Sequence, residues 1–324
     1  MRLPRRRFLH LASGAVALPA VSRIARAQTY PSRPVRIVAG FAAGGGVDIA
    51  ARLIGQSLSE RLGQQFVVEN RTGAGSNIGT EAVVNAAPDG YTLLLATTTN
   101  AINATLYAKL NYDFIRDIAP VATIGRVAYV VAVHPAFPAK TLLEFIAYAK
   151  ANPGRVNMAA VTGASDHMAG ELLKMMTGID FVHVPYRGVA PALTDLMAGQ
   201  VQLGFPAMTA SLEHFRAGRL RALAVTSTTR SQLLPDIPAV SEFFPGYEAI
   251  QWYGIGVPKK TPTEIVEKLN REINAAIATP KLRARLADLG AEPMSMTPVE
   301  FEKFIAMETE KWGKVVKLAG IKVE

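Results

Sequence analysis

Three consecutive glycines, Gly44 to Gly46, join a predicted strand at 34–40 to a predicted helix at 48–62. A backbone without side chains can approach a ligand closely. The first amides of a helix have no partner inside the helix, and the helix dipole adds about half a positive charge at that end. Such a loop is suited to an anion, although a tight turn with nothing bound would show the same residues.

Two further loops carry polar groups after predicted strands. The segment Gly73–Gly79 has the spacing Gly-x-Gly-x-x-x-Gly, which is neither the dinucleotide motif nor a phosphate loop with its lysine. Four polar residues, Thr97 to Asn100, follow the apolar strand predicted at 91–96, and the carboxyl end of a buried strand is a common place for a ligand. A polar cap on the next helix is the alternative for these residues.

The pair Asp166-His167 is the candidate for catalysis. It could line a ligand loop, or Asp166 could occupy the first turn of a helix, where a carboxylate favours the positive end of the dipole. Arg187, which follows Pro185 and Tyr186, could pair with an anion or with a surface carboxylate. The chain has no cysteine, no Gly-x-Ser-x-Gly and no His-Glu-x-x-His, and its five histidines lack metal-ligand spacing. No metal or cofactor is therefore predicted.

The periodicity of apolar residues predicts an α/β protein. Helix predictions rest on apolar faces such as Ile49, Leu53, Leu58 and Leu62, and strand predictions rest on short apolar runs. The predicted strands are 34–40, 65–69, 91–96, 127–133, 156–161, 181–184, 201–205 and 220–225, and the predicted helices include 48–62, 80–84, 168–176, 187–197, 264–278 and 298–318. The alternation without a long polar linker favours two α/β domains joined by strand-like crossovers.

Three helix starts have a threonine followed by a glutamate three residues later, a pair that can satisfy two amides of the first turn. These pairs are Thr141 with Glu144, Thr261 with Glu264, and Thr297 with Glu300. In the last two, a proline follows the threonine at the first helical position, where no amide hydrogen is needed.

The first 27 residues have the layout of an export signal. Four arginines within residues 2–7 precede an apolar run at 8–18 that is too short to span a bilayer, and the segment closes on Ala25-Arg26-Ala27. The arginine cluster resembles a twin-arginine signal, with an ordinary arginine-rich secretory signal as the alternative. We expect export to the periplasm with cleavage after Ala27.

Loss of this leader changes the charge. The whole chain carries +9, and six of these charges lie in the leader, so residues 28–324 carry +3. This mild surplus is spread along the chain, whereas nucleic-acid-binding proteins concentrate basic residues on one face. We therefore expect no nucleic-acid partner. No later apolar run is long enough to span a membrane, which favours a soluble periplasmic protein.

Blocks of residues that recur in order along nearly the whole chain after the leader carry a resemblance. They are Val35 to Leu53, Val68 to Arg71, Gly73 to Gly75, Asn77 to Gly79, Ala87 to Leu93, Val184 to Gly188, Ala190 to Leu193 and Leu234 to Pro238. The sequence resembles the substrate-binding proteins of tripartite tricarboxylate transporters, also called the Bug or TctC family. The resemblance implies an α/β, two-lobed periplasmic-binding-protein fold (Venus flytrap, type II) with two crossover strands, which closes on a small organic anion, often a carboxylate.

The resemblance also implies which residues bind the ligand, when the family's contact segments are placed on matching positions. In the first lobe these are Phe41, Ala43, Gly44, Gly45, Asp48, Ser76, Asn77, Thr98, Thr99 and Asn100; in the second lobe they are Gly163, Ser165, Asp166, His167, Tyr186 and Arg187. The family holds its carboxylate largely by loop amides, hydroxyls and bridging waters. We expect Thr98, Thr99 and Ser165 to supply hydroxyl donors.

The chain departs from the family's usual pattern at several of these loops. Gly40 and Ala43 stand where prolines are usual, Ser76 where a glycine is usual, and Val189 where a small polar residue or glycine is common; a frequent aspartate is missing near Pro206. Loops that lack proline have more conformational freedom when open, so closure on a ligand costs more entropy.

These observations together predict a periplasmic solute receptor. It would capture an organic anion as a monomer and pass it to the membrane subunits of a tripartite tricarboxylate-type transporter. We expect the first lobe to comprise 28–127 with 253–324 and the second 128–252, with a hinge of two extended strands near 128 and 250.

Two other classes of protein can share this architecture. One is an exported enzyme that uses Asp166 and His167. The other is the effector-sensing domain of a transcription regulator, against which the export leader and the lack of a helix-turn-helix motif argue.

Overall fold

The computed structural model describes residues 30–323. The predicted leader and its cleavage site after Ala27 lie outside the described residues. Arg33–Glu324 forms one compact unit, and the fold below is that of this unit. Among the described residues, no helix combines the length and apolar character needed to cross a bilayer.

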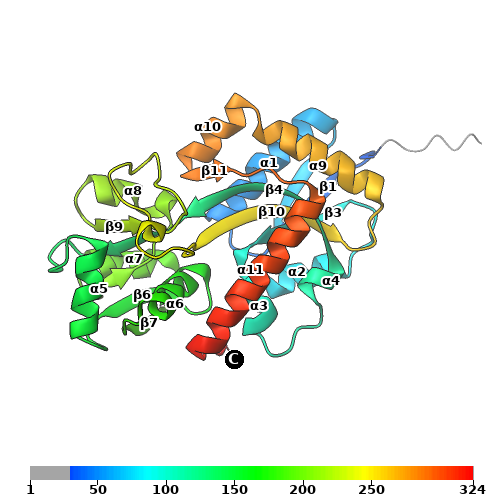
Figure 1. The fold of residues 1–324 in the computed structure, drawn as a ribbon. Coiled ribbons are helices and arrows are strands. Elements are labelled where there is room, and N and C mark those ends of the chain that lie inside the picture. Colours follow the sequence, from blue (N-terminus) through cyan, green and yellow to red (C-terminus); the bar gives the residue numbers. More distant parts are fainter. Residues whose placement is uncertain (1–29, 324) are drawn as a thin grey trace, which may run out of the picture. The chain divides into compact units, whose positions relative to one another are not determined.

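A six-stranded mixed sheet forms the first half of the unit (Figure 1). Its strand order is β11-β4-β10-β3-β1-β2, in which β1 is parallel to β2 and β3, while β10 is antiparallel to β3 and β4. The strands are β1 (Val35–Ala39), β2 (Phe66–Asn70), β3 (Thr92–Thr97), β4 (Ile118–Ala128), β10 (Ile250–Pro258) and β11 (Ala291–Pro293). Every residue of β3 is buried, as expected for an apolar strand in the middle of a covered sheet.

A five-stranded sheet forms the second half, with the order β7-β6-β8-β5-β9. Its strands are β5 (Val130–Val133), β6 (Asn157–Val161), β7 (Val182–Tyr186), β8 (Leu203–Gly204) and β9 (Arg221–Val225). The single strand predicted at 127–133 is thus two strands, β4 and β5, which belong to different sheets. The two sheets confirm the predicted two-lobed α/β fold.

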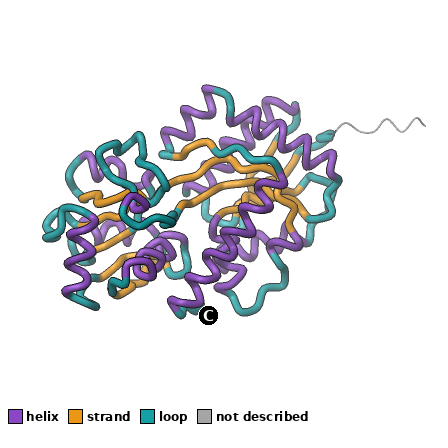
Figure 2. Tube along the Cα trace, viewed as in Figure 1, coloured by secondary structure: helices purple, strands orange, loops and turns teal. Residues whose placement is uncertain are grey.

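Helices cover both sheets (Figure 2). They are α1 (Gly46–Leu62), α2 (Asn77–Val84), α3 (Thr98–Leu106), α4 (Phe114–Asp117), α5 (Leu142–Ala151), α6 (Ser165–Thr177), α7 (Val189–Met197), α8 (Met208–Arg216), α9 (Thr263–Ile277), α10 (Pro280–Asp288) and α11 (Pro298–Ala319), with 3-10 turns at Ala74–Ser76 and Val240–Glu242. Helices α4, α8 and α10 were not predicted, and α3 corresponds to the alternative in which Thr97 to Asn100 cap a following helix. Thr98 to Asn100, expected in a loop, form the first turn of α3 because Thr97 and Asn100 make a capping box.

Two of the three predicted threonine caps are confirmed. Thr297 accepts a hydrogen bond from the Glu300 amide at the start of α11, and Thr141 accepts one from the Glu144 amide at the start of α5. The prediction for Thr261 was wrong. Its hydroxyl donates to the carbonyl of Pro258 at 2.8 Å, and the N-cap of α9 is Pro262, one residue after the threonine expected in that role.

The chain passes between the sheets at Tyr129, which separates β4 from β5, and returns along β10. One side chain joins the two crossings. The hydroxyl of Thr226 accepts from the Tyr129 amide at 2.8 Å and lies 2.6 Å from the carbonyl oxygen of Ala249, just before β10. The crossing segments are therefore held side by side by a buried threonine.

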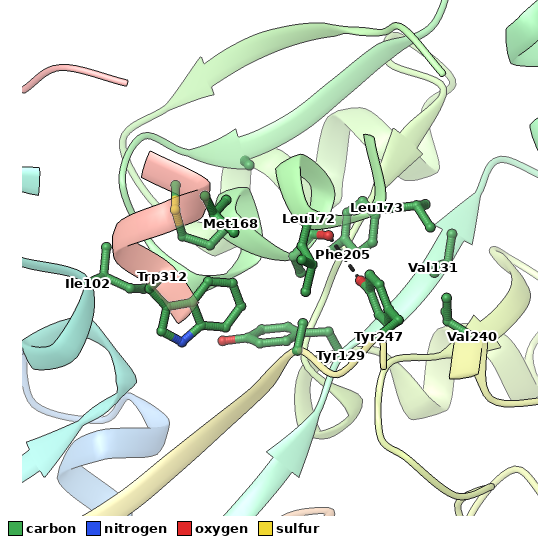
Figure 3. Packing of buried hydrophobic residues seen from close by; sticks show 14 of the residues in the cluster. Ile102, Tyr129, Val131, Met168, Leu172, Leu173, Phe205, Val240, Tyr247 and Trp312 are labelled. Atoms are coloured by element: carbon green, nitrogen blue, oxygen red, sulfur yellow. Dashed lines mark hydrogen bonds between the residues drawn. The ribbon is translucent and has the colours of Figure 1, made fainter. Parts of the chain in front are cut away.

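One cluster of buried apolar side chains extends across both halves. Figure 3 shows Ile102 of α3, Met168 of α6 and Trp312 of α11 packed together in it. The C-terminal helix thus contributes to the core of both sheets, and burial of such large side chains is the main source of stability for a fold of this kind.

Candidate ligand-binding site

A cavity of about 730 Å³ lies between the two sheets. The first half contributes the glycine loop, the start of α1, Thr99 and the end of α10, and the second half contributes β6, the loop before α6, α7 and the segment 204–210. The crossing strands contribute Tyr129, Gln251 and Tyr253. This volume lies within the range of small-molecule binding sites.

Five helices begin at this cavity: α1, α3, α6, α7 and α8. Four of them have N-cap residues whose side chains make no capping hydrogen bond, and these residues are Gly45, Ala164, Gly188 and Ala207. Of the helices that begin outside the lining, α5, α10 and α11 are capped by threonine side chains, whereas α2 and α9 also lack a side-chain cap. At α1, α7 and α8 the helix ends therefore keep amide donors and a positive dipole end for a guest with negative charge, whereas at α6 the carboxylate of Asp166 accepts amides of the first turn.

Seven of the sixteen residues predicted to bind ligand line the cavity. They are Phe41, Gly44, Gly45, Thr99, Ser165, Asp166 and Arg187. The other nine are not part of the lining, and they are Ala43, Asp48, Ser76, Asn77, Thr98, Asn100, Gly163, His167 and Tyr186. Most of these nine use their polar groups to hold the loops that do line it.

Asp48 folds the glycine loop. Its carboxylate accepts the Gly44 amide at 2.9 Å and the Asn70 side-chain amide at 3.0 Å, and it forms an ion pair with Arg52 at 2.9 Å. The hydrogen bond from Arg52 is the main reason that the pKa of Asp48 is lowered to about 2. Asn70 also donates to the carbonyl of Phe41 at 3.0 Å, so this network sets the path of the loop.

Thr98 and Asn100 fix the start of α3. The Thr98 hydroxyl donates to the carbonyl of Ile250 at 3.1 Å and accepts the Trp252 amide at 3.0 Å, which ties the helix to the crossing strand β10. The side chain of Asn100 accepts the Thr97 amide at 2.8 Å and donates to Thr80 at 2.8 Å. Thr99 is thus the hydroxyl of this turn that faces the cavity.

Ser76 and Asn77 lie behind the glycine loop, away from the lining. The side-chain oxygen of Asn77 accepts from Asn103 at 2.8 Å and from the hydroxyl of Tyr112 at 2.7 Å. Ser76 is 1% exposed, has a positive φ of 79°, and its hydroxyl has no hydrogen-bond partner among the described residues. Both residues pack the fold at this point.

His167 supports the loop before α6. Its Nδ1 accepts the Gly163 amide at 3.1 Å, so in this arrangement the ring carries its proton on Nε2, which lies 3.7 Å from Glu171. The ring stacks on His183 with centroids 3.8 Å apart. Tyr186 is likewise occupied, because its hydroxyl donates to Asp195 of α7 at 2.6 Å.

Three polar side chains of the crossing strands, Tyr129, Gln251 and Tyr253, line the cavity although none of them was a predicted site residue. The Tyr129 hydroxyl lies 2.5 Å from Oγ of Ser165 and 3.4 Å from Oε1 of Gln251. A Cβ placed on Gly46 would lie 3.0 Å from the hydroxyl of Tyr253, so the glycine allows α1 to start against that tyrosine. The predicted extended crossings near 128 and 250 could have pointed to these residues, because strands that cross between two lobes run along the base of the cleft between them.

Asp166 and Arg187 are the charged side chains of the lining. Burial raises the pKa of Asp166 to about 6, although hydrogen bonds from the amides of Val161 and His167 oppose this. Burial also raises the pKa of Tyr129, which keeps its phenol protonated. Within residues 30–323 no cluster of histidine and acidic side chains could hold a metal ion.

A two-lobed α/β fold with uncapped helix ends around an inter-lobe cavity is the architecture of solute-binding proteins. The family model described as "Tripartite tricarboxylate transporter family receptor" matches residues 50–321, and the chain belongs to this family. It is 37% identical to Protein BugT of Bordetella pertussis over 98% of this chain and 97% of that protein.

Solved structures agree with this assignment. R. palustris Rpa4515 with adipate has a TM-score of 0.81 and 37% identity, covering 90% of this chain and 99% of that one. The periplasmic binding protein BugD has a TM-score of 0.78 and 34% identity, covering 91% and 100%. MatC from Rhodopseudomonas palustris with bound malate has a TM-score of 0.77 and 32% identity, covering 89% and 100%.

The matching family is one of transporter receptors and BugD is a periplasmic binding protein, and the chain is accordingly a periplasmic solute-binding protein rather than an enzyme. The alternative of an exported enzyme that uses Asp166 and His167 is therefore set aside.

Proposed function

We propose that the protein captures a small organic anion, a carboxylate, in the cavity between its lobes and delivers it to the membrane subunits of a tripartite tricarboxylate-type transporter. The single observation that carries this proposal is the set of four uncapped helix N-termini at the cavity, at Gly45, Ala164, Gly188 and Ala207. Backbone amides at such ends bind anions without a buried counter-ion. The adipate and malate in the structures of two relatives support a carboxylate as the ligand.

Within this proposal the carboxylate contacts the glycine loop at Gly44 and Gly45 from one side. From the other side it contacts the turn at Ser165, and Thr99 adds a hydroxyl donor. Tyr129, which is 2.5 Å from Ser165, aligns that hydroxyl from the crossing strand. Asp48, Thr98, Asn100 and His167 act at a distance, because their hydrogen bonds hold the binding loops in place.

We also propose that the lobes, 28–127 with 253–324 and 128–252, close around the ligand by rotation about the crossings at Tyr129 and Ile250. The buried hydroxyl of Thr226 joins these two crossings. Tyr129 itself lines the cavity, and Ile250 directly precedes the lining residue Gln251. Motion there would bring the helix ends of the two halves together on the ligand. The receptor would act as a monomer, and export would end with cleavage of the leader after Ala27.

A thermal-shift and calorimetry screen with adipate, malate and succinate tests the proposed function. A ligand at 100 times its dissociation constant should raise the free energy of unfolding by about 2.7 kcal/mol. If neither these acids nor other carboxylates change the melting temperature or give a heat of binding, the proposal is wrong.

The variant Gly45→Asp links binding to the helix ends. Gly45 has φ −80° and ψ 167°, and a Cβ placed on it would lie 3.6 Å from its nearest neighbour, so an aspartate fits and can cap α1 with its own carboxylate. Stability should change by only a few tenths of a kcal/mol. Carboxylate affinity should fall at least tenfold because of repulsion and lost donors. Leu143→Asp adds the same charge in the exposed first turn of α5, outside the lining, and should leave affinity unchanged.

A further inference from the structure

One side of the cavity is an apolar wall formed by α7. Val189, Ala192, Leu193 and Leu196 all line the cavity, and their spacing of three, four and seven residues places them on one face of the helix. The polar residue Asp195 is not in the lining, and its carboxylate accepts from Tyr186 instead. Val189 is 48% exposed, whereas Ala192, Leu193 and Leu196 also pack in the core of the second half, so α7 meets the ligand space chiefly through Val189 and the edge of Leu193.

The other half of the molecule adds apolar groups to the same cavity. Leu286 and Leu289 line it from the end of α10, and Phe205 lines it beside β8. The charged residues of α10 are outside the lining. The cavity thus has amide and hydroxyl donors at the helix ends, and it has aliphatic or aromatic surface elsewhere, with Asp166 and Arg187 as its charged side chains.

From this division we infer that the ligand is an amphipathic carboxylate. Its carboxylate meets the helix ends at Gly45 and Ser165, and an apolar body, an alkyl chain or an aromatic ring, lies against Val189 and Leu193. The inference rests on the proposed function and specifies its substrate class. Transfer of each buried methylene from water to such a wall strengthens binding roughly fourfold.

Calorimetry with matched acids tests this at pH 7.5. The probes are butanoate, hexanoate and 3-phenylpropanoate. Hexanoate should bind roughly fifteenfold more tightly than butanoate, since it buries two more methylenes. Affinity independent of chain length would overturn the inference while leaving carboxylate capture intact.

Two valine variants locate the wall. Val189 is 48% exposed and lines the cavity, whereas Val182 is 47% exposed on β7 and does not. Because both are exposed, substitution by serine should leave the fold intact, as the melting temperature would verify. Val189→Ser should weaken hexanoate and 3-phenylpropanoate binding three- to tenfold, and Val182→Ser should have no effect. Equal affinities in the two variants would contradict the assignment of the wall. Failure of every carboxylate to bind wild type would overturn both the inference and the proposed function.

Discussion

Ser76 occupies the space in which a side chain at Gly40 would lie. A Cβ placed on Gly40 would be 1.9 Å from Oγ of Ser76, and Ser76 has a positive φ of 79° that favours glycine. These are two of the positions at which the chain departs from its family's usual pattern. The two departures depend on each other in this chain, because the side chain of Ser76 fits behind the glycine loop only while position 40 has no side chain.

This contact predicts that substitutions at the two positions are not additive. Gly40→Ala should lower the free energy of unfolding by about 1 to 3 kcal/mol through overpacking. Ser76→Gly alone should be stabilising by up to about 1 kcal/mol, because glycine accepts the left-handed backbone. In the double variant most of the loss at Gly40 should disappear, as urea denaturation would measure. Additive effects would show that the loop relaxes around the contact.

The bond between Tyr129 and Ser165 predicts an energetic link between the crossing strand and the start of α6. Removal of either hydroxyl by Tyr129→Phe or Ser165→Ala should be destabilising, with a coupling energy of about 0.5 to 1.5 kcal/mol in a double-mutant cycle. Tyr247→Phe is the control, because Tyr247 donates to the carbonyl of Ala169 and does not contact Ser165 in this way. A coupling near zero for the first pair would contradict the link.

Asp166 predicts a pH-dependent stability. Its pKa of about 6 in the folded protein lies above the ordinary value of 3.8, so the folded state binds this proton more tightly than the unfolded state. Stability from this group is complete below about pH 4 and is lost as the pH rises through 6. Asp166→Asn should therefore be more stable than wild type by about 1 to 2 kcal/mol at pH 8 and equal to it near pH 4.

Chemical denaturation at several pH values measures this difference, and Asp236→Asn, at an exposed site outside the lining, is the control. A gain for Asp166→Asn that is the same at pH 4 and pH 8 would rule out ionisation as its cause.

Carboxylate binding should also depend on pH, because protonation of Asp166 removes a negative charge from the cavity. Affinity should rise as the pH falls from 7 to 5 in wild type and stay constant over this range in Asp166→Asn.

Glu308 joins the C-terminal helix to the crossing strand β10. Its Oε2 accepts the indole N–H of Trp252 at 3.1 Å and that of Trp312 at 2.9 Å, and the carboxylate is also paired with Lys311. Glu308→Ala leaves two buried indole donors without an acceptor and should cost about 2 to 4 kcal/mol. Glu308→Gln keeps one carbonyl oxygen and should cost less than half of that. Tryptophan fluorescence during urea denaturation reports the loss, and equal costs for both variants would exclude the indole bonds as the cause.

Local signals in the sequence predicted the strands and helices whose causes are local. The apolar run at Tyr91 to Ala96 became a fully buried strand, and the cap at Thr297 formed because both partners lie within one turn. Thr261 shows the limit of this reasoning. The same threonine-proline-glutamate pattern did not form a cap there, because the nearby carbonyl of Pro258 took the hydroxyl.

The candidate site was predicted at the level of loops and not of individual side chains. The glycine loop and the turn at Ser165 do face the cavity, as the position of loops after strands indicated. Thr98 and Thr99 look alike in sequence, yet Thr98 bonds to β10 and Thr99 faces the cavity. The choice depends on the rotation of α3 against a strand about 150 residues away, which spacing along the chain cannot encode.

The order of residues alone indicated an α/β protein with anion-suited helix starts, because glycine runs and apolar periods act over a few neighbouring residues. The layout of the first 27 residues likewise predicts a leader of the export type. Only the tertiary structure decided that Tyr129, Gln251 and Tyr253 join those starts around one cavity, and that α7 turns an apolar face toward it. Those relationships arise where the chain crosses between sheets, and contacts between distant segments depend on how the two sheets pack against each other.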